Sequence, residues 1–417
     1  MSGPVLRPDL SPLRSRDFRA VFVSRTVAMF GSQAAEVALL VQAKQLTGSP
    51  LVVGLLGVAE VVPLVIFGLS GGALADRFDR RQLMRWCEPG MACCAVILLA
   101  NSLLPRPALW PLFAVAALLV AISALQRPSF EAATPRLVPP GQLTAAVALL
   151  AMFQNASVLV GSSLGGVLAI TPGPWLVYAL DAAGFVVSFW MLGRLPALPA
   201  EPDPGEAPGG QAAEPVLRQV FGGLRYAVTR RDLLGSYLAD LSAMVFAYPN
   251  ALFPFMAVTL RAPWSAGLMF AAPSLGAFLL SATSGWMGRI RRHGLAIALS
   301  AALWGAGIAA FGLSPDIYAA LACLVAAGAA DESSGIFRDM LWKQSIPDRL
   351  RGRMAGVEML SYAGGPPLGQ LRSGVMASAF GIRFSLAAGG LCCVAAVAVV
   401  CSALPALTRY RVTLPED

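Results

Sequence analysis

Ionisable side chains recur inside long apolar stretches of this chain, at spacings that place several of them on one side of a helix. Residues three, four, seven or eleven positions apart project from the same side of a helix. A charge inside a bilayer costs at least about 2.5 kcal/mol on insertion scales, so we expect these groups to face a cavity or one another. The polar stripes are Arg25, Ser32 and Glu36; Ser123, Arg127 and Glu131; Ser236 and Asp240; Asp331, Ser334 and Arg338; and Glu332, Asp339 and Lys343.

Carboxyl groups without an obvious basic partner in the sequence are the strongest candidates for carrying protons. Glu36, Glu60, Asp331 and Glu332 lie well inside their apolar stretches. Burial and a like-charged neighbour both favour the protonated form of a carboxyl group, and a group that titrates near neutral pH can exchange protons. We therefore expect a buried Glu36, together with Asp331 or Glu332, to form the proton site.

Several other charged residues also have purely structural interpretations. A spacing of four residues fits a pair within one helix as well as it fits a binding site, and a carboxylate in an outer helix fits a packing hydrogen bond. These alternatives apply to Arg127 with Glu131, to Asp339 with Lys343, and to Asp181.

Twelve apolar stretches of about twenty residues carry these groups. The hydrophobic fraction is 57%, the charged fraction is 13% and the mean hydropathy is +0.67, which indicates an all-α membrane protein with many spans. We predict spans at about 18–45, 51–75, 82–104, 109–135, 142–170, 174–194, 233–259, 265–288, 293–313, 316–345, 354–379 and 383–405.

Arginines are concentrated in alternate gaps between these spans. By the positive-inside rule both termini are cytoplasmic, and we expect a multi-pass protein of the bacterial cytoplasmic (inner) membrane. The net charge of +8 is explained by loop arginines that face anionic lipid, so it implies no nucleic-acid partner.

The segment 195–215 is rich in Pro, Gly and acidic residues, which is typical of a flexible linker. It separates six spans from six. We therefore predict an N-terminal six-helix bundle at 1–194, a cytoplasmic linker with an amphipathic helix at 195–231, and a C-terminal six-helix bundle at 232–417. The basic and apolar spacing of 216–231 predicts that helix. Two pseudo-symmetric halves of this kind place a substrate site at the midplane.

The segment Gly72–Arg81 reads G-A-L-A-D-R-F-D-R-R, with Asp79 where the pattern G-x-x-x-D-R-x-G-R-R has glycine. This pattern resembles the hairpin motif of the major facilitator superfamily. An aspartate and several arginines at a helix end can hold or release a cytoplasmic gate through charge pairs. The expected gate residues are Gly72, Asp76, Arg77, Arg80 and Arg81, with Arg351, Gly352 and Arg353, and Glu358 is expected to belong to the same gate.

Further segments resemble the branch of that superfamily that contains the enterobactin exporters and macrolide-efflux-like pumps. They are 18–22, 37–42, 46–49, 53–55, 134–139, 181–185 and 347–353. The resemblance implies two pseudo-symmetric six-helix bundles, export of a small organic molecule in exchange for protons, and a cavity lined by the first, fourth, seventh and tenth spans. Antiporters of this kind carry a Gly-Pro pair in the fifth span; here Ser162 replaces the proline, which predicts a less kinked helix.

Other function classes lack their sequence signatures. The seven cysteines have no metal-ligand spacing and are interpreted as packing residues. No nucleophile–base set or phosphate loop indicates an enzyme. We expect no cofactor or metal, and a monomer whose partners are a small-molecule substrate, protons and the lipid bilayer. Uptake of a nutrient by proton symport, or a membrane sensor or scaffold that has lost transport, are the alternatives.

Overall fold

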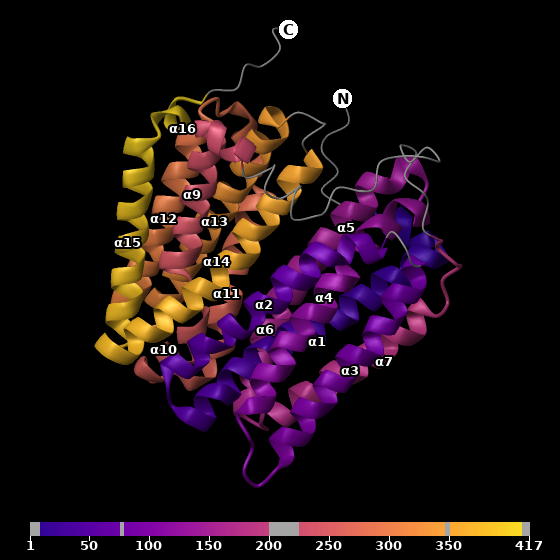
Figure 1. The fold of residues 1–417 in the computed structure, drawn as a ribbon. Helices are drawn as coiled ribbons and strands as arrows, with labels where there is room; N and C mark the ends of the chain where they lie inside the picture. The colour runs from indigo at the N-terminus through magenta and orange to yellow at the C-terminus, as the bar shows by residue number, and fades with distance from the viewer. Residues whose placement is uncertain (1–8, 76–78, 200–224, 347–350, 411–417) are drawn as a thin grey trace. The chain divides into compact units, whose positions relative to one another are not determined.

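The computed structural model describes residues 9–75, 79–199, 225–346 and 351–410. Within these ranges the regular structure is helical and no strand is formed. The described α-helices are α1 (Arg16–Thr47), α2 (Pro50–Ala75), α3 (Arg80–Leu103), α4 (Trp110–Leu137), α5 (Leu143–Ala156), α6 (Ser162–Ile170), α7 (Pro174–Leu192), α9 (Arg231–Ala247), α10 (Phe253–Thr259), α11 (Ala266–Ala282), α12 (His293–Leu313), α13 (Ile317–Ser345), α14 (Arg351–Phe380), α15 (Ile382–Ala403) and α16 (Pro405–Arg409) (Figure 1).

Ten segments of the described chain are long and apolar enough to cross a bilayer. Three of them combine shorter pieces, because α5 with α6, α9 with α10, and the 3-10 turn Pro263–Ser265 with α11 each form one stretch. Helices α1 and α14 are longer still, at 32 and 30 residues. With these two the all-α membrane fold has twelve spanning segments, as the sequence predicts.

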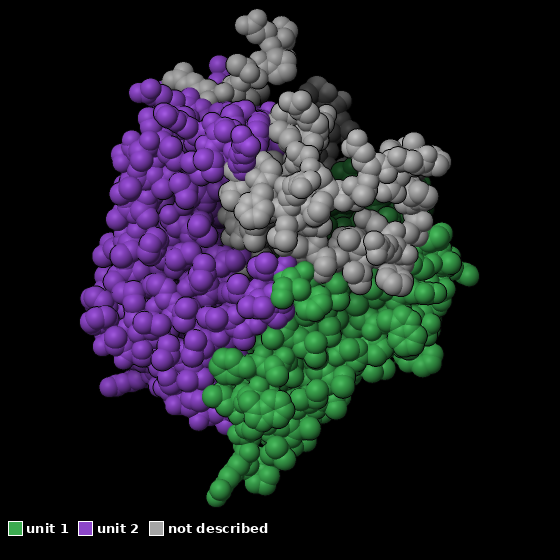
Figure 2. Space-filling model, in the orientation of Figure 1, with its two compact units in different colours: residues 1–39, 66–210 green, residues 40–65, 211–417 purple. Residues whose placement is uncertain are grey.

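The chain forms two compact units, which are shown in different colours in Figure 2. Unit 1 contains residues 1–39 and 66–210, and unit 2 contains residues 40–65 and 211–417. The hairpin that joins α1 to α2 is therefore assigned to unit 2. The bundle boundaries at 194 and 232 remain a prediction.

Aromatic and aliphatic side chains form the core of unit 1 at one end of its helices. Phe18 and Phe22 on α1 pack with Phe130 on α4, and Phe153 on α5 meets the Phe22 ring edge-on at 4.7 Å between ring centroids. Helix α3 packs against both α4 and α7. Gly165 on α6 lies against the backbone of Ala34, so α6 and α1 approach closely through small residues.

Helix α12 is central to the packing of unit 2, where it contacts α9, α13 and α15; α12, α13 and α15 lie side by side in Figure 1. Helices α11 and α13 approach closely, because Gly276 lies against the backbone of Val325 and Gly328 against Pro273. A side chain at either glycine would overlap the neighbouring helix. Residues 225–229, the described end of the predicted amphipathic helix, are helical, and Ala227 packs into the core of unit 2.

The span formed by α5 and α6 contains a π-helical turn at Ser157–Gly161. The Ser157 hydroxyl donates to the Phe153 carbonyl at 2.7 Å, and the Ser163 hydroxyl donates to the Leu159 carbonyl at 2.7 Å. A π turn interrupts the α-helical hydrogen-bond ladder without proline. The prediction of a less kinked helix, based on Ser162 replacing proline, did not anticipate this irregularity one residue earlier.

Candidate functional site

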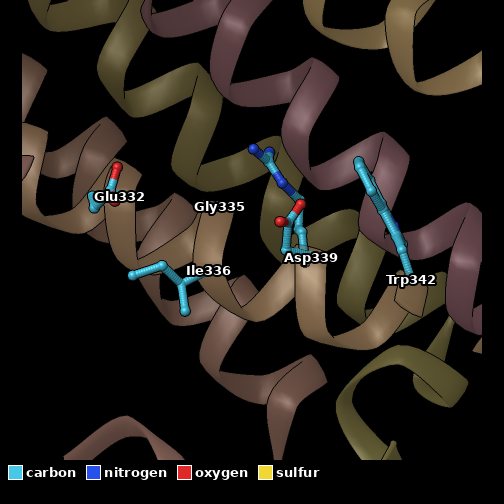
Figure 3. Close-up of a pocket in the computed structure, with 6 residues that line it drawn as sticks. Glu332, Gly335, Ile336, Asp339 and Trp342 are labelled. Carbon is cyan, nitrogen blue, oxygen red and sulfur yellow. The ribbon is translucent and has the colours of Figure 1, made fainter. Parts of the chain in front are cut away.

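One face of α13 lines a pocket of about 270 Å³ in unit 2. Its lining combines two carboxylates, a guanidinium group and an indole ring, all from a membrane-spanning helix. Figure 3 shows Glu332, Asp339 and Trp342 along this face, with Gly335 and Ile336 between them. The absence of a side chain at Gly335 helps to leave the pocket open. The sixth lining residue is Arg338.

Arg338 and Asp240 form an ion pair between α13 and α9. The Asp240 side chain is 1% exposed and the Arg338 side chain 14% exposed. A buried charge of either sign would be very costly alone, so each residue makes the other tolerable inside the unit. The sequence placed both residues among the site candidates, and the structure brings them together.

Aromatic rings support this ion pair from the C-terminal half of α13. The Arg338 guanidinium lies 5.9 Å from the centroid of the Trp342 ring, within cation–π range. Trp342 stacks on Tyr237 at 4.7 Å between centroids, and its indole N–H donates to the Ser236 hydroxyl at 3.0 Å. The Trp342 ring is therefore fixed on both its face and its edge.

The adjacent Asp331 and Glu332 are both partly exposed. Ser281 on α11 donates to Glu332 Oε1 at 2.7 Å, so Glu332 has a partner that the sequence could not indicate. Asp331 lies within the electrostatic influence of Glu332. Further along α13, Lys343 donates to Asp339 at 3.1 Å, and both side chains are largely exposed. The interpretation of Asp339 and Lys343 as a solvated pair is confirmed.

In unit 1, α1 and α4 present a second group of charges. Arg127 donates to Glu131 Oε1 at 3.0 Å, and their side chains are 61% and 59% exposed. The Arg25 guanidinium lies 5.8 Å from the centroid of the Phe130 ring and interacts electrostatically with Arg127 and Glu131. The stripes of the first and fourth spans therefore meet, and Arg127 with Glu131 is also the intrahelical pair that the sequence allowed.

Glu36 is accessible although protein atoms surround it densely. The Gln33 amide donates to its Oε2 at 3.4 Å. The expectation that Glu36 carries a proton stays a prediction. Glu60, on α2, is partly buried and is not unpaired in the structure.

The most deeply buried carboxyl groups of unit 1 are Glu88 and Asp181, each 1% exposed. Gln126 on α4 donates to Glu88 Oε1 at 2.7 Å. Two carboxyl oxygens, Glu88 Oε2 and Asp181 Oδ1, are buried without a hydrogen-bond partner. Sequence reasoning missed Glu88 and offered a packing hydrogen bond for Asp181. The available signal for Glu88 was a carboxylate six residues inside the predicted span 82–104, followed by Pro89.

The described gate residues bind backbone carbonyls of unit 1. Arg81 donates to the Gly193 carbonyl at 2.6 Å, and Arg80 donates to the Ala132 carbonyl at 3.3 Å, which ties α3 to the ends of α7 and α4. Asp79 caps α3 by accepting from the Gln82 N–H at 3.1 Å, which explains how an aspartate serves where the motif has glycine.

Other gate residues give no side-chain geometry. Asp76 and Arg77 lie outside the described residues. For the remaining ones the structure gives only the helix that contains them, which is α2 for Gly72 and α14 for Arg351, Gly352, Arg353 and Glu358.

Arg372 is a charged residue of α14 that sequence reasoning did not single out. Its guanidinium donates to the Ser385 carbonyl at 3.0 Å and to the Val245 carbonyl at 3.3 Å, and it lies against Gly389. The side chain thus joins α14 to α15 and α9 through neutral carbonyl groups. We interpret it as a packing residue.

Metal-ligating residue types are scattered in the described part of the chain. No group of three or more His, Cys, Asp or Glu side chains could hold a metal ion there. The seven cysteines are free, and Cys87, Cys94 and Cys393 are buried.

Comparison with known families decides the class of this architecture. A family model described as transmembrane secretion effector matches residues 8–412, nearly the whole chain. The chain belongs to this family. It is a branch of the major facilitator superfamily, so the resemblance inferred from the hairpin motif is confirmed. Members of this superfamily are transporters, and the chain is a multi-pass membrane protein and not an enzyme.

Curated relatives extend the match over the full length. The enterobactin exporter EntS of Shigella boydii serotype 4 (strain Sb227) is 28% identical over 409 residues, which cover 96% of this chain and 94% of the relative. EntS of Escherichia coli O139:H28 (strain E24377A / ETEC) has the same identity and coverage.

Solved structures of other major facilitators share the fold. A mutant of the nucleoside transporter NupG superposes with a TM-score of 0.76 at 12% identity, covering 94% of this chain and 100% of that one. A bacterial homologue of the human lysosomal transporter Spinster, in an inward-facing and unoccupied conformation, gives 0.73 at 16% identity, covering 97% and 99%. At these identities the likeness concerns the fold alone.

Proposed function

We propose that this protein is a secondary active transporter that exports a small organic molecule of the siderophore type across the bacterial cytoplasmic membrane, in exchange for protons. The observation that carries the proposal is the charged and aromatic pocket on α13, in a chain whose full-length relatives export enterobactin. A membrane helix that keeps carboxylate, guanidinium and indole groups beside a pocket fits the passage of a polar, ring-containing molecule.

Substrate binding is assigned to the groups whose geometry can contact a ligand. In unit 2 these are Arg338 and Trp342 at the pocket, with Asp240 holding Arg338 in place. In unit 1 they are Arg25 and the exposed pair of Arg127 and Glu131 on α4. Alternating access would expose these groups first to one side of the membrane and then to the other.

Proton exchange is assigned to Glu332 and Asp331 on α13, with Glu36 and Glu60 as further candidates. Glu332 lines the pocket and accepts a hydrogen bond from the neutral Ser281 hydroxyl, so its charge can change while this contact is kept. Arg80 and Arg81, with Asp76 and Arg77, are assigned to the cytoplasmic gate, and both termini are assigned to the cytoplasm.

Inside-out membrane vesicles test both the direction and the coupling of transport. With an acidified lumen, vesicles that contain the protein should accumulate enterobactin and release lumenal protons when it is added. A macrolide and a tetracycline serve as comparison substrates. Accumulation that survives a protonophore would contradict proton coupling, and uptake that occurs only in right-side-out vesicles would indicate a symporter.

Two variants of α13 locate the proton site. Glu332→Gln should abolish uphill accumulation but leave counterflow, which needs no net proton movement. Asp339→Asn, on the same pocket but paired with Lys343 at the surface, is the matched control and should retain coupling. Glu36→Gln should behave like Glu332→Gln only if Glu36 also carries the proton. If Glu332→Gln accumulates substrate at the parental rate, the assignment to Glu332 is wrong.

A further inference from the structure

Unit 1 contains two carboxyl groups that the transport assignment does not use. Glu88 on α3 and Asp181 on α7 are each 1% exposed, the lowest exposure of any carboxylate in that unit's described residues. Helices α3 and α7 pack against each other, and Glu88 is close enough to act on Asp181 electrostatically. The charge of one group therefore affects the other inside the helix bundle.

Their polar partners are neutral. Gln126 donates to Glu88 Oε1 at 2.7 Å and also to the Met84 carbonyl at 3.0 Å. Ser188, whose hydroxyl pairs with Ser24 at 2.6 Å, lies within reach of Glu88. Ser32 on α1 lies within reach of Asp181. The neighbours of the two carboxyl groups are thus one amide and two hydroxyl groups, none of which carries a compensating charge.

The cations of the surrounding helices are engaged elsewhere. On α3, the Arg85 guanidinium lies 4.4 Å from the centroid of the Phe189 ring. On α1, Arg25 lies over Phe130, and on α4, Arg127 pairs with Glu131 at the surface. Among the described residues neither Glu88 nor Asp181 makes an ion pair. The other titratable neighbours of Asp181 are Cys94 on α3 and Tyr178 on α7.

Each carboxyl group also leaves one buried oxygen without a partner, Glu88 Oε2 and Asp181 Oδ1. Two ionised carboxylates in this position would repel each other and lose their hydration without a counter-ion, which is far more costly than binding a proton. A protonated carboxyl group, in contrast, turns one of these oxygens into a hydrogen-bond donor.

We propose that Glu88 and Asp181 form a proton-binding site within unit 1 that holds at least one proton at neutral pH. The proton comes from water and returns to water, and no other bond changes. The site is distinct from the pocket on α13, because its residues, its helices and its unit are different.

The site is also in direct contact with α1. Gly31 faces Asp181 so closely that a Cβ atom at position 31 would lie 3.0 Å from the Asp181 Cα. A second negative charge at Asp181 would recruit water to this dry contact and loosen α7 from α1. Proton release from the site should therefore weaken the packing of the helix that carries Arg25 and Glu36.

Infrared difference spectroscopy on the purified full-length protein tests the proposal without any substrate. At neutral pH the wild type should show a carbonyl band from a protonated carboxyl group that disappears on alkalinisation. Glu88→Gln or Asp181→Asn should remove or shift this band. Glu131→Gln, which changes an exposed carboxylate of the same unit, should leave it unchanged. If both site variants keep the wild-type band, the proposal is overturned.

Thermal unfolding in detergent at a series of pH values gives the second measurement. The wild type should lose stability on alkalinisation, because a charge is then forced into a site without a counter-ion, and the variant with both amides should show a smaller loss. An amide has nearly the shape of a neutral carboxyl group, so the variants should fold at neutral pH. Variants that fail to fold, or that lose as much stability as the wild type, would also overturn the proposal. Failure of the export assay would leave both measurements unaffected.

Discussion

The two units solve the same problem, a carboxylate inside a helix bundle, in different ways. In unit 2, Asp240 is neutralised by Arg338 from the facing helix, and the arginine is in turn supported by Trp342. In unit 1, Glu88 and Asp181 lie on two helices that pack together, within electrostatic range of each other, and their polar partners are neutral. The first arrangement is fixed across a wide range of pH, whereas the second depends on bound protons. Carboxyl groups that are buried to a similar degree therefore stabilise the helix packing in unit 2 and respond to protons in unit 1.

The largest effect is expected from breaking the ion pair of unit 2. Asp240→Asn leaves the Arg338 charge in a mostly buried position without compensation, and the loss of stability should be about 3–5 kcal/mol. Thermal unfolding in detergent, compared with the wild type, measures it.

The double variant Asp240→Asn with Arg338→Gln is the control for this experiment. It removes both charges and should recover much of the stability. If Asp240→Asn is as stable as the wild type, Asp240 does not compensate the buried charge of Arg338. The proposed difference between a paired carboxylate in unit 2 and unpaired carboxyl groups in unit 1 would then be wrong.

The next effect concerns the contact beside the buried carboxyl groups of unit 1. Gly31→Ala places a methyl group against Asp181, and overpacking of this kind costs about 1–3 kcal/mol. Combining it with Asp181→Ala should relieve part of the loss, which thermal unfolding of the four proteins in the cycle would reveal. Strict additivity of the two changes would mean that Gly31 and Asp181 do not press on each other.

A smaller effect should follow from weakening the support of the ion pair. Trp342→Phe keeps a ring on Tyr237 but removes the N–H that donates to Ser236, so the loss should be about 1 kcal/mol. Denaturation of the purified protein measures it. An equal loss in a Ser236→Ala background would show that this hydrogen bond is not the cause.

The smallest effects are expected at the exposed pairs, one in each unit. Glu131→Gln in unit 1 and Asp339→Asn in unit 2 each remove one partner of an exposed pair four residues apart, and the change in stability should be about 0.5 kcal/mol or less. Any strong loss of transport in Glu131→Gln at unchanged stability would then identify a ligand contact.

The helices were largely predictable from the sequence. The ninth span, 293–313, coincides with α12, and most other span ends agree within about two residues, because the bilayer imposes length and apolar composition on each segment. The eighth span is an exception: α11 ends at Ala282, and Ser284–Arg289 forms a separate 3-10 helix. The glycines and polar residues of Ser284–Arg289 are compatible with an α-helix as well as with a 3-10 helix, so the sequence did not reveal the change.

The candidate site was only partly predictable. Helical spacing grouped Glu332 with Asp339 on α13, and both residues line the pocket. It placed Arg338 on a different stripe, with Asp331 and Ser334, although Arg338 lines the same pocket. It could not reveal that Arg338 pairs with Asp240, that Ser281 reaches Glu332, or that Gln126 reaches Glu88, since each partner belongs to another helix. The accessibility of the Glu36 side chain could not be predicted for a related reason, because the face that α1 turns to its neighbours depends on tertiary packing.

The π turn at Ser157–Gly161 changes how the fifth span must be numbered onto a helical wheel. Each residue of a regular α-helix advances the wheel by about 100°. A π turn contains more residues per turn, so each of its residues advances the wheel by a smaller angle. Residues before Ser157 and residues after Gly161 therefore belong to two wheels with different phases. A single wheel drawn through 143–170 would assign lipid-facing and protein-facing positions correctly in one half of the span and misassign them in the other.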